Sequence, residues 1–465
     1  MPAKRARSTR TDLATRRFRL APWALAVVLA SGLTPLAQAQ SLFELYEAAR
    51  GFDAPYLAAR ALAESALYRA EQAHAKRRPS LGLTTSATRS SNESPSSDSS
   101  TRSVSAGLAG SQSLFNAAND ATIEQADKGI DAAKADVEVA EQDLIVRVAQ
   151  AYFDVLAAQD ALATAQAGKA AISEQLASAK RNFEVGTATI TDTREAQARY
   201  DLATAQELAA DNDLRAKRIA LDTLVGRTSV TPRPLAVPIN LTPVAGSVDE
   251  WVGPTEESPN VRKARIAFDV AKLETDKARA GHLPTLDLNG SYGKGHVSSN
   301  GSQIASSGVF AGSAVPFSTS GQTMSSSIGV TLTLPLFAGY AIQNRVKETL
   351  SLEDQARNNL EAARRSVAQG TRVAYFGVQS LQAQVRALEA AESSSQLALE
   401  ATQLGYKVGV RVNIDVLNAQ TQLFTTRRDL AKARYDVLVN SLKLRQAAGT
   451  LKADDMLAVN QLLAK

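Results

Sequence analysis

Two short stretches contain the residues whose types and spacing best suit a chemical role. GTATITDTREAQ begins at Gly186 and GVRVNIDVLNAQ begins at Gly409; each has an Asp six positions after the Gly and ends in Ala-Gln. Asp192 and Asp415 are therefore equivalent positions, 223 residues apart. A carboxylate can accept charge-assisted hydrogen bonds, so the donors that accompany each copy decide what it can bind.

The two copies differ in these donors. Phe183 in the first copy corresponds to Tyr406 in the second, and Ala188 corresponds to Arg411. Only the second copy thus has a phenol and a guanidinium that can bind a carboxylate. A purely structural interpretation also fits, because an Asp that follows a Gly turn is a common helix cap and the other two residues are ordinary at a helix end. The residues alone leave both interpretations open.

The repeat extends far beyond these stretches. The same offset of 223 relates further pairs: Tyr152-Phe153 and Tyr375-Phe376, Leu221 and Leu444, Gly226 and Gly449. Such an ordered series predicts one duplication. We therefore expect a first structural repeat over 40–226, a linker over 227–258, a second repeat over 259–449 and a C-terminal segment over 450–465.

The composition of each repeat predicts very long helices. All 15 prolines lie outside the windows 116–231 and 336–465, and Ala, Gln, Glu, Leu, Lys and Arg dominate inside them. Gly186 and Gly409 interrupt the windows as turns, so each window predicts a helix of roughly 70 residues and another of roughly 35. A helix of that length reaches about 100 Å.

A heptad pattern indicates how these helices pack. Five apolar residues recur every seven positions: Val416, Leu423, Leu430, Val437 and Leu444. This spacing is that of a coiled-coil seam. A two-stranded coiled coil remains an alternative, but Ala on the other faces favours a curved wall of several helices.

Alternating segments between the helices predict β-hairpins at about 80–114 and 284–336. SIGVTLTLPL places Ile328, Val330 and Leu332 on one face and Thr331 on the other. We expect strands of about ten residues, paired across the Ser-rich loops SSNESPSSDSST and GSQIASSGVFAGSAVPF. Hairpins of this kind suit a membrane barrel with a wet lumen. Four strands per chain cannot close a barrel, so several chains must share one sheet, with eight strands from two copies or twelve from three.

The N-terminal 39 residues indicate export. They combine a basic region, the short apolar run APWALAVVLASGL and Ala37-Gln38-Ala39, which is the pattern of a secretory signal peptide. Residues 1–39 carry a net charge of +6 and the whole chain +5, so the remainder is at −1. This near-neutral remainder argues against a nucleic-acid partner. The chain also lacks Cys, which excludes disulfides and thiolate chemistry.

No catalytic or metal motif is present in the sequence. His74, His282 and His296 belong to no metal-binding spacing. GSYGKG, which begins at Gly290, lacks the spacing of a phosphate-binding loop, and we expect a turn of the barrel there. The sequence therefore predicts a protein that is not an enzyme and uses no cofactor or metal.

The duplicated helix–strand plan, together with YKVGVRVNIDVLNAQTQL and ARYDVLVNSLKLRQAAGTL, resembles the TolC family of outer-membrane efflux and secretion channels. The resemblance implies a mixed α and β fold, with a long α-helical coiled-coil tunnel (an α-barrel) and a transmembrane β-barrel of four strands per chain, twelve in a homotrimer. It further implies location in the outer membrane, with the tunnel in the periplasm. The implied partners are outer-membrane lipid, a periplasmic adaptor and an inner-membrane ABC or RND transporter.

The resemblance also assigns roles to the repeated residues. It implies that Thr191 and Asp192 accept bonds from Tyr406 and Arg411, which hold the periplasmic mouth shut. It places Asp415 in a lumen ring that attracts cations. Asn418 stands where some relatives have a second Asp, so we expect weak cation preference and weak block by trivalent cations. A trimeric coiled-coil surface stalk or adhesin without a transport role is the alternative function.

Overall fold

A computed structural model describes residues 40–236, 243–305, 307–309 and 312–464. The predicted signal peptide, 1–39, lies outside this part. Four long helices dominate the structure: α3 (Ala117–Glu184), α4 (Ile190–Val225), α7 (Ala341–Lys407) and α8 (Asn413–Ala447). They contain 68, 36, 67 and 35 residues, which confirms the long and short helix of each repeat. The other long elements are α2 (Ala54–His74) and α6 (Pro259–Ala280).

Local sequence signals set where these helices begin and end. The Asn116 side chain accepts from the backbone N–H groups of Ala118 and Asn119 at the start of α3. Thr189 forms a capping box with Asp192 at the start of α4. Gly226 follows α4 with φ 69°, a left-handed conformation that glycine adopts at little cost. The helix boundaries thus follow from capping chemistry as well as from composition.

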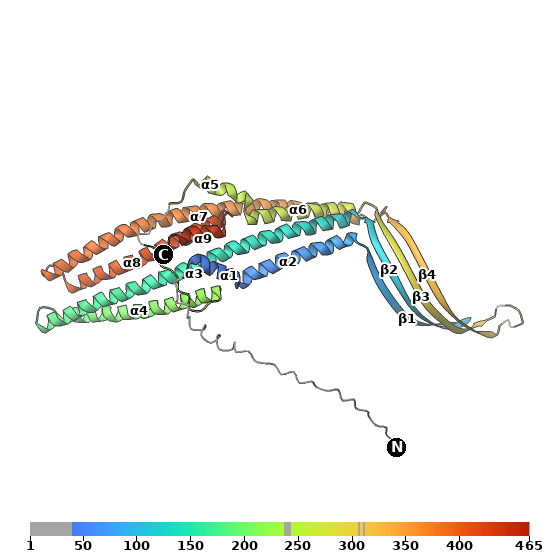
Figure 1. Cartoon of the computed structure of the whole chain (residues 1–465), viewed down its shortest axis with the longest axis horizontal. Coiled ribbons are helices and arrows are strands. Elements are labelled where there is room, and N and C mark those ends of the chain that lie inside the picture. Colours follow the sequence, from blue (N-terminus) through green and yellow to red (C-terminus); the bar gives the residue numbers. More distant parts are fainter. Residues whose placement is uncertain (1–39, 237–242, 306, 310–311, 465) are drawn as a thin grey trace, which may run out of the picture. The chain divides into compact units, whose positions relative to one another are not determined.

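The helices run side by side in two groups (Figure 1). Next to the sheet, α2 packs on α3, α3 on α6, and α6 on α7. Beyond them, α4 packs along α3 and α8 packs along α7, and α3 also contacts α8. Each repeat therefore contributes one long helix that continues past the sheet-side helices and pairs with its own shorter helix.

The main hydrophobic core lies around the middle of α3. Tyr152 and Phe153 are fully buried there, with α1 (Leu42–Arg50), the C-terminal half of α8 and α9 (Ala453–Asn460) packed around them. The Tyr152 hydroxyl lies within hydrogen-bond distance of two backbone carbonyls, those of Gln40 and Arg233, and donates its one proton to either of them. Its oxygen accepts from the Arg233 N–H. Burial raises the pKa of this phenol well above its usual range. The linker and the start of the described chain are thus fastened to the same core.

The linker carries two short helices and lies against the helices of both repeats. They are α5 (Val248–Val252) and the 3₁₀ segment η2 (Gly253–Glu257). Tyr375 of α7 donates its hydroxyl to the carbonyl of Gly246 at 3.0 Å. The C-terminal segment joins the linker through a bridge between Leu235 and Leu463.

The sheet has four antiparallel strands in the order β1-β2-β3-β4. They are β1 (Ser80–Ser94), β2 (Ser97–Phe115), β3 (Thr285–Ile304) and β4 (Ala314–Thr333), with 15 to 20 residues each. The predicted strand length of about ten residues is therefore wrong. Ten of the twelve residues in the first Ser-rich segment that was expected to form a loop belong to strands, and so do both ends of the second segment.

Cross-strand polar pairs explain the longer strands. Ser86 bonds Ser105 at 2.8 Å and Thr101 bonds Ser299 at 2.9 Å, so short polar side chains stabilise pairing without apolar burial. The turn expected at GSYGKG is also wrong, since these residues lie inside β3. Gly293 there faces Gly107 of β2, where a Cβ on Gly107 would come within 3.4 Å of the neighbouring backbone. Close backbone approach, and not a turn, accounts for these glycines.

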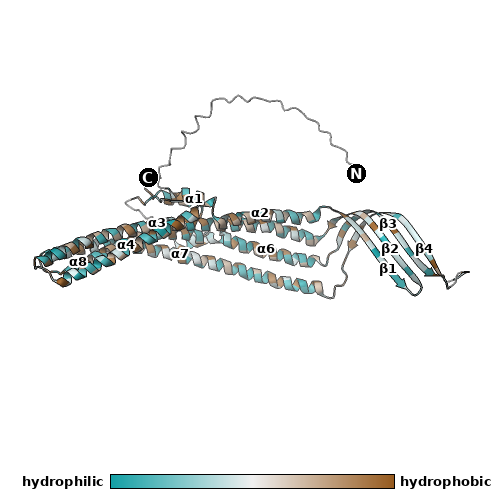
Figure 2. Cartoon of the chain, turned by 90° about the horizontal axis from the view of Figure 1, so that it is seen from below, coloured by the Kyte–Doolittle hydropathy of each residue, from teal (hydrophilic) through white to brown (hydrophobic). Residues whose placement is uncertain are grey.

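One face of the sheet is apolar over the half next to the helices, as the strand registers show. Figure 2 shows hydrophobic and hydrophilic residues interspersed along these strands. The register aligns Leu286 with Leu332 and Leu288 with Val330, and the side chains of β4 lie on the faces that the alternation predicted. We call this the apolar face, and its main residues are all exposed or half-buried in the single chain: Leu81, Leu83, Leu108, Leu286, Leu288, Tyr292, Ile328, Val330 and Leu332.

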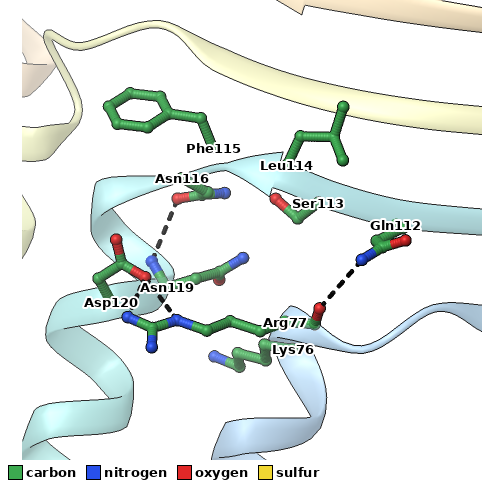
Figure 3. Close-up of a pocket in the computed structure, with 9 residues that line it drawn as sticks. All are labelled: Lys76, Arg77, Gln112, Ser113, Leu114, Phe115, Asn116, Asn119 and Asp120. Carbon is green, nitrogen blue, oxygen red and sulfur yellow. Dashed lines mark hydrogen bonds and ion pairs between the residues drawn. The ribbon is translucent and has the colours of Figure 1, made fainter.

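A small pocket marks the junction of helices and sheet (Figure 3). Arg77, at the end of η1 (Ala75–Arg77), donates two hydrogen bonds to one Asp120 oxygen at 2.9 and 2.7 Å. Gln112 of β2 donates to the carbonyl of Arg77 at 3.5 Å. These contacts tie η1, three residues before β1, to the end of β2 and the start of α3.

Within the described part of the chain, none of the helices combines the length and the apolar character that a membrane crossing requires.

Candidate gate at the helix turns

The two repeats make the same turn between their long and short helices. The first tip turn (Val185–Thr189) joins α3 to α4, and the second tip turn (Val408–Val412) joins α7 to α8. Gly186 and Gly409 adopt φ 78° and 81°. Four backbone hydrogen bonds recur in both turns, and equivalent distances differ by at most 0.1 Å. The two turns therefore share the same backbone geometry, and any functional difference between them lies in their side chains.

Asp192 caps its own helix. Its Oδ2 atom accepts from the Thr189 N–H at 2.9 Å and from the Thr189 hydroxyl at 2.7 Å, and its N–H donates to that hydroxyl oxygen at 3.2 Å. Thr191 is exposed at the next position toward the turn. The carboxylate is half-buried, and its Oδ1 atom accepts no hydrogen bond from the described residues.

The expected donors lie at the other tip turn but do not reach Asp192 within one chain. The Tyr406 hydroxyl accepts from the Asn182 side-chain amide at 3.3 Å. The Arg411 guanidinium, 60% exposed, lies 3.7 Å from the Asp415 carboxylate. The direct links to Asp192 and Thr191 inferred from the resemblance are therefore not formed inside the described chain. The capping alternative accounts for the contacts that Asp192 makes here.

Other residues connect the two tip turns, and sequence reasoning missed them. The buried Asn413 side chain, at 1% exposure, donates to the backbone carbonyl of Asp192 at 3.2 Å and accepts from Gln175. Arg199 of α4 donates to Asn418 of α8 at 2.9 Å. The intrachain connection thus consists mainly of neutral amide hydrogen bonds.

The repeat contained a signal for these residues. Asn413 occupies the position of Ile190 in the first copy, so an amide replaces an apolar side chain that is half exposed. Similarly, Asn182 corresponds to Gly405, where a Cβ would come within 2.9 Å of the Arg411 side chain. The second copy therefore has an amide at 413 where the first copy has an apolar side chain. The first copy has an amide at 182, where the second copy has a glycine that leaves room for Arg411.

The candidate ring residues Asp415 and Asn418 lie in the first two turns of α8. Asp415 accepts from the Val412 N–H at 3.4 Å in addition to its contact with Arg411. Its side chain is 35% exposed, and Asn418 one turn later is exposed. Arg411 is thus positioned to offset part of the negative charge of Asp415.

Long paired helices with conserved turn geometry and a sheet with an apolar face are features of an outer-membrane channel with a periplasmic helical tunnel. The model of the family "Outer membrane efflux protein" matches residues 45–227 and 255–450. Outer membrane protein TolC of Escherichia coli K12 is 32% identical over 94% of this chain and 87% of its own length. TolC of Vibrio cholerae is 33% identical over 91% and 93%, respectively. The chain belongs to the TolC family of outer membrane efflux proteins.

Solved structures show the same fold. CusC aligns with a TM-score of 0.73 at 21% identity over 88% of this chain and 92% of its own. VceC from Vibrio cholerae aligns with a TM-score of 0.72 at 21% identity over 88% and 96%. A more partial relative, the alkaline protease secretion protein AprF of Pseudomonas aeruginosa, is 33% identical over 68% of this chain and 63% of its own length. The protein is therefore an outer-membrane efflux or secretion channel and not an enzyme.

Proposed function

We propose that the protein is the homotrimeric exit duct of a tripartite efflux or type I secretion system. Substrates pass passively through it from an inner-membrane ABC or RND transporter, to which a periplasmic adaptor joins it. The sequence contains no catalytic or phosphate-binding motif that would drive transport, so in this proposal the free energy comes from the transporter. The comparisons favour this channel over the surface stalk considered from the sequence.

The two free edges of the sheet carry this proposal. β1 and β4 are the terminal strands, and in the described chain each pairs on one side only. An open edge in lipid leaves backbone N–H and C=O groups without partners, at a cost of several kcal/mol for each group. Pairing of β4 with β1 of the next copy removes this cost, and three copies supply twelve strands.

Exposed apolar residues on α7 support assembly as well. Phe376 is 55% exposed, whereas its counterpart in the first repeat, Phe153, is 1% exposed. Val373, Leu397 and Leu404 on the same helix are also more than 60% exposed. Burial of such side chains against a neighbouring copy is favourable by about 25 cal/mol for each Å². The exposed apolar side chains of α7 therefore have no packing partner within the described chain, and a neighbouring protomer would provide one.

The gate that we propose joins the tip turns of neighbouring protomers. Within the described residues no acceptor takes the Tyr406 hydroxyl proton, Arg411 makes one long ion pair, and the Oδ1 atom of Asp192 has no donor. Thr191 is exposed beside it. These unused groups are complementary, so Tyr406 and Arg411 of one protomer are assigned to Asp192 and Thr191 of the next. Each exposed link contributes about 0.2–1 kcal/mol.

Such a gate is weak for each protomer and symmetric in the assembly. Threefold repetition makes opening cooperative, and an adaptor that binds the open state more tightly than the closed state shifts the population. Asp415 and Asn418 then line the narrow lumen as a selectivity ring. Because Arg411 lies 3.7 Å from Asp415, this ring attracts cations only weakly.

Single-channel recording of the purified oligomer in a planar bilayer tests the gate. We expect a small, steady conductance for wild type and a larger one for the double variant Tyr406→Phe/Arg411→Ser. Lys407→Ser is the matched control, because this exposed cation ends α7 beside the second tip turn and takes no part in the gate. An equal conductance in all three proteins would remove these residues from the gate. Absence of conductance from every oligomer would favour the stalk.

Native mass spectrometry of the same preparation tests the assembly. Three chains per complex is the expected result, and a stable dimer would contradict the twelve-stranded barrel.

Site-specific photo-crosslinking from Val410, which is 78% exposed in the second tip turn, tests binding of the adaptor. We expect the crosslink to form with the adaptor in whole cells and to vanish in cells from which its gene is deleted.

A further inference from the structure

Two arginines face each other on the apolar face of the sheet. Arg89 of β1 pairs directly with Arg102 of β2. Alternation places them on the same side as Leu83 and Leu108, because Ala87 with Val104 and Thr85 with Ala106 are the intervening pairs on that side. Like charges directly opposite each other destabilise a strand pair. Both arginines are exposed, and neither has an ion pair with any described residue.

Two further basic groups lie on the same face of β3. His296 pairs with Val104 and Lys294 pairs with Ala106, so both follow Arg102 diagonally across the sheet. The His296 Nε2 atom lies 3.2 Å from the Ser320 hydroxyl, and Lys294 has no carboxylate partner among the described residues. We call Arg89, Arg102, His296 and Lys294 the basic cluster.

The height of the basic cluster on the sheet is informative. The apolar face begins at the helix side with Phe115, which pairs with Leu286, and the Arg pair lies thirteen residues further along β2. At 3.3 Å for each residue and a tilt of 35–45°, this separation spans roughly 30 Å of membrane thickness. The apolar band of an outer-membrane barrel is about 25 Å tall. The arginines therefore lie just beyond the hydrocarbon, at the depth of the outer-leaflet headgroups. Lys294 pairs with Ala106, four positions nearer the helices, so it lies at the upper edge of the hydrocarbon and its long side chain extends toward the headgroups.

We propose that the basic cluster binds the phosphate groups of an anionic lipid headgroup in the outer leaflet. Each guanidinium presents a planar fork of donors that matches two phosphate oxygens. Two forks on neighbouring strands, with an imidazole and an ammonium beside them, complement a headgroup that carries phosphate. The lipid removes the repulsion between the two arginines, and its acyl chains cover the Leu residues below them.

The hairpin end supplies the competing interpretation. Glu93 and Asp98 form the next charged pair toward the turn, on the same face and separated from the arginines by the Ser91–Ser100 pair. No ion pair joins the two charged pairs in the described structure. If they neutralise each other in the membrane, the arginines have no need of a lipid. The inference depends on the membrane location of the sheet and is independent of the gate and of the partner proteins.

Lipid retention by the intact oligomer tests the inference. The protein is reconstituted in nanodiscs of phosphatidylcholine that contain a small fraction of lipopolysaccharide, repurified in detergent, and the retained lipopolysaccharide is measured by native mass spectrometry. We expect Arg89→Gln/Arg102→Gln to reduce retention roughly tenfold or more. Arg365→Gln/Arg372→Gln, which removes the same charge from exposed positions of α7, is expected to retain wild-type levels.

Three further measurements make the result decisive. Enzymatically dephosphorylated lipopolysaccharide is expected to bind wild type as weakly as native lipopolysaccharide binds the double variant. Inorganic phosphate at millimolar concentration is expected to leave retention unchanged, and full displacement would show a free-anion site and overturn the lipid assignment. Should the double variant fail to insert, Arg89→Lys/Arg102→Lys keeps the charge without the fork and is expected to show intermediate retention. Wild-type retention by an inserted Gln variant refutes the proposal, whereas its channel conductance tests the proposed function separately.

Discussion

The buried Asn413 side chain donates a hydrogen bond to the backbone carbonyl of Asp192 at 3.2 Å, which joins the start of α8 to the first turn of α4. It also accepts from Gln175 of α3. One amide thus connects three helices close to both tip turns. This neutral contact fixes the backbone of Asp192, from which its carboxylate projects. The charged residues near the turns gave no indication of it in the sequence.

Removal of this amide should loosen the tip turns. Asn413→Ala leaves the Gln175 amide without its partner and removes the bond that the Asp192 carbonyl accepts from outside its own helix, which costs about 1–3 kcal/mol. We expect faster proteolysis at the tip turns and a larger conductance, while the oligomer stays intact. Asn359→Ala on the exposed surface of α7 is the control and is expected to change neither property. If the two variants behave alike, the three-helix connection has no part in closing the tip.

The tip-turn glycines should be required for backbone reasons. A Cβ on Gly186 or Gly409 would meet no atom within 4 Å, so the positive φ alone makes substitution unfavourable. Ala at either position is expected to destabilise the turn by about 1 kcal/mol, measured as a lower midpoint of thermal unfolding. Gly129→Ala in the N-terminal part of α3 also meets no atom and is expected to stabilise by a similar amount. Equal shifts in all three variants would contradict the role of φ.

The helices were predictable because their signals are local. Proline-free windows fixed α3 and α7 within a few residues of 70, and the glycines of positive φ ended them. The alternation in β3 and β4 likewise assigned side chains to the correct faces, since Leu288 and Val330 share the apolar face, but it did not specify which residues pair. The strand ends were not predictable, since serines that extend the barrel by cross-strand hydrogen bonds have the same composition as serines in a loop.

The candidate site was predictable only in part. The repeat located Asp192, Tyr406, Arg411 and Asp415 at the two tip turns, but their partners depend on which helix faces which. That arrangement brings Asn182 to Tyr406 across 224 sequence positions, and no periodicity within one helix encodes it. Links between protomers depend in addition on symmetry, which a single chain does not contain.

The charge on the proposed lumen ring should respond to Arg411. In Arg411→Ser the Asp415 carboxylate loses the guanidinium 3.7 Å away, so the ring becomes more negative. We expect stronger cation selectivity, seen as a larger reversal potential in a KCl gradient, and tighter block by a trivalent cation. Arg411→Ser/Asp415→Asn should abolish both gains. Persistence of the gains in this double variant would place the selective charge elsewhere.

The ion pair between Asp53 and Arg147 should make stability depend on pH. Arg147 donates to both carboxylate oxygens at 2.8 Å, and this bonding lowers the pKa of the buried Asp53. A folded-state pKa below the unfolded value of about 3.9 contributes stability above that pH, and the contribution is lost as the pH falls through the folded pKa. Asp53→Asn is therefore expected to lower the unfolding midpoint at pH 7, and this difference from wild type is expected to shrink as the pH falls below about 3.9. Asp131→Asn, at an exposed i,i+3 pair, serves as the control.

The orientation of the sheet can be tested with two neighbouring residues of β4. Val330 pairs with Leu288 on the apolar face, whereas Thr331 pairs with Asp287 on the opposite face. A lysine at position 330 enters lipid at a cost of about 2–4 kcal/mol near the midplane, while a lysine at position 331 faces the wet lumen beside a carboxylate. We expect Val330→Lys to reduce the heat-stable oligomer recovered from outer membranes and Thr331→Lys to leave its amount unchanged. The reverse result would show that the apolar face lines the lumen, and the assignment of the basic cluster to lipid would then be wrong.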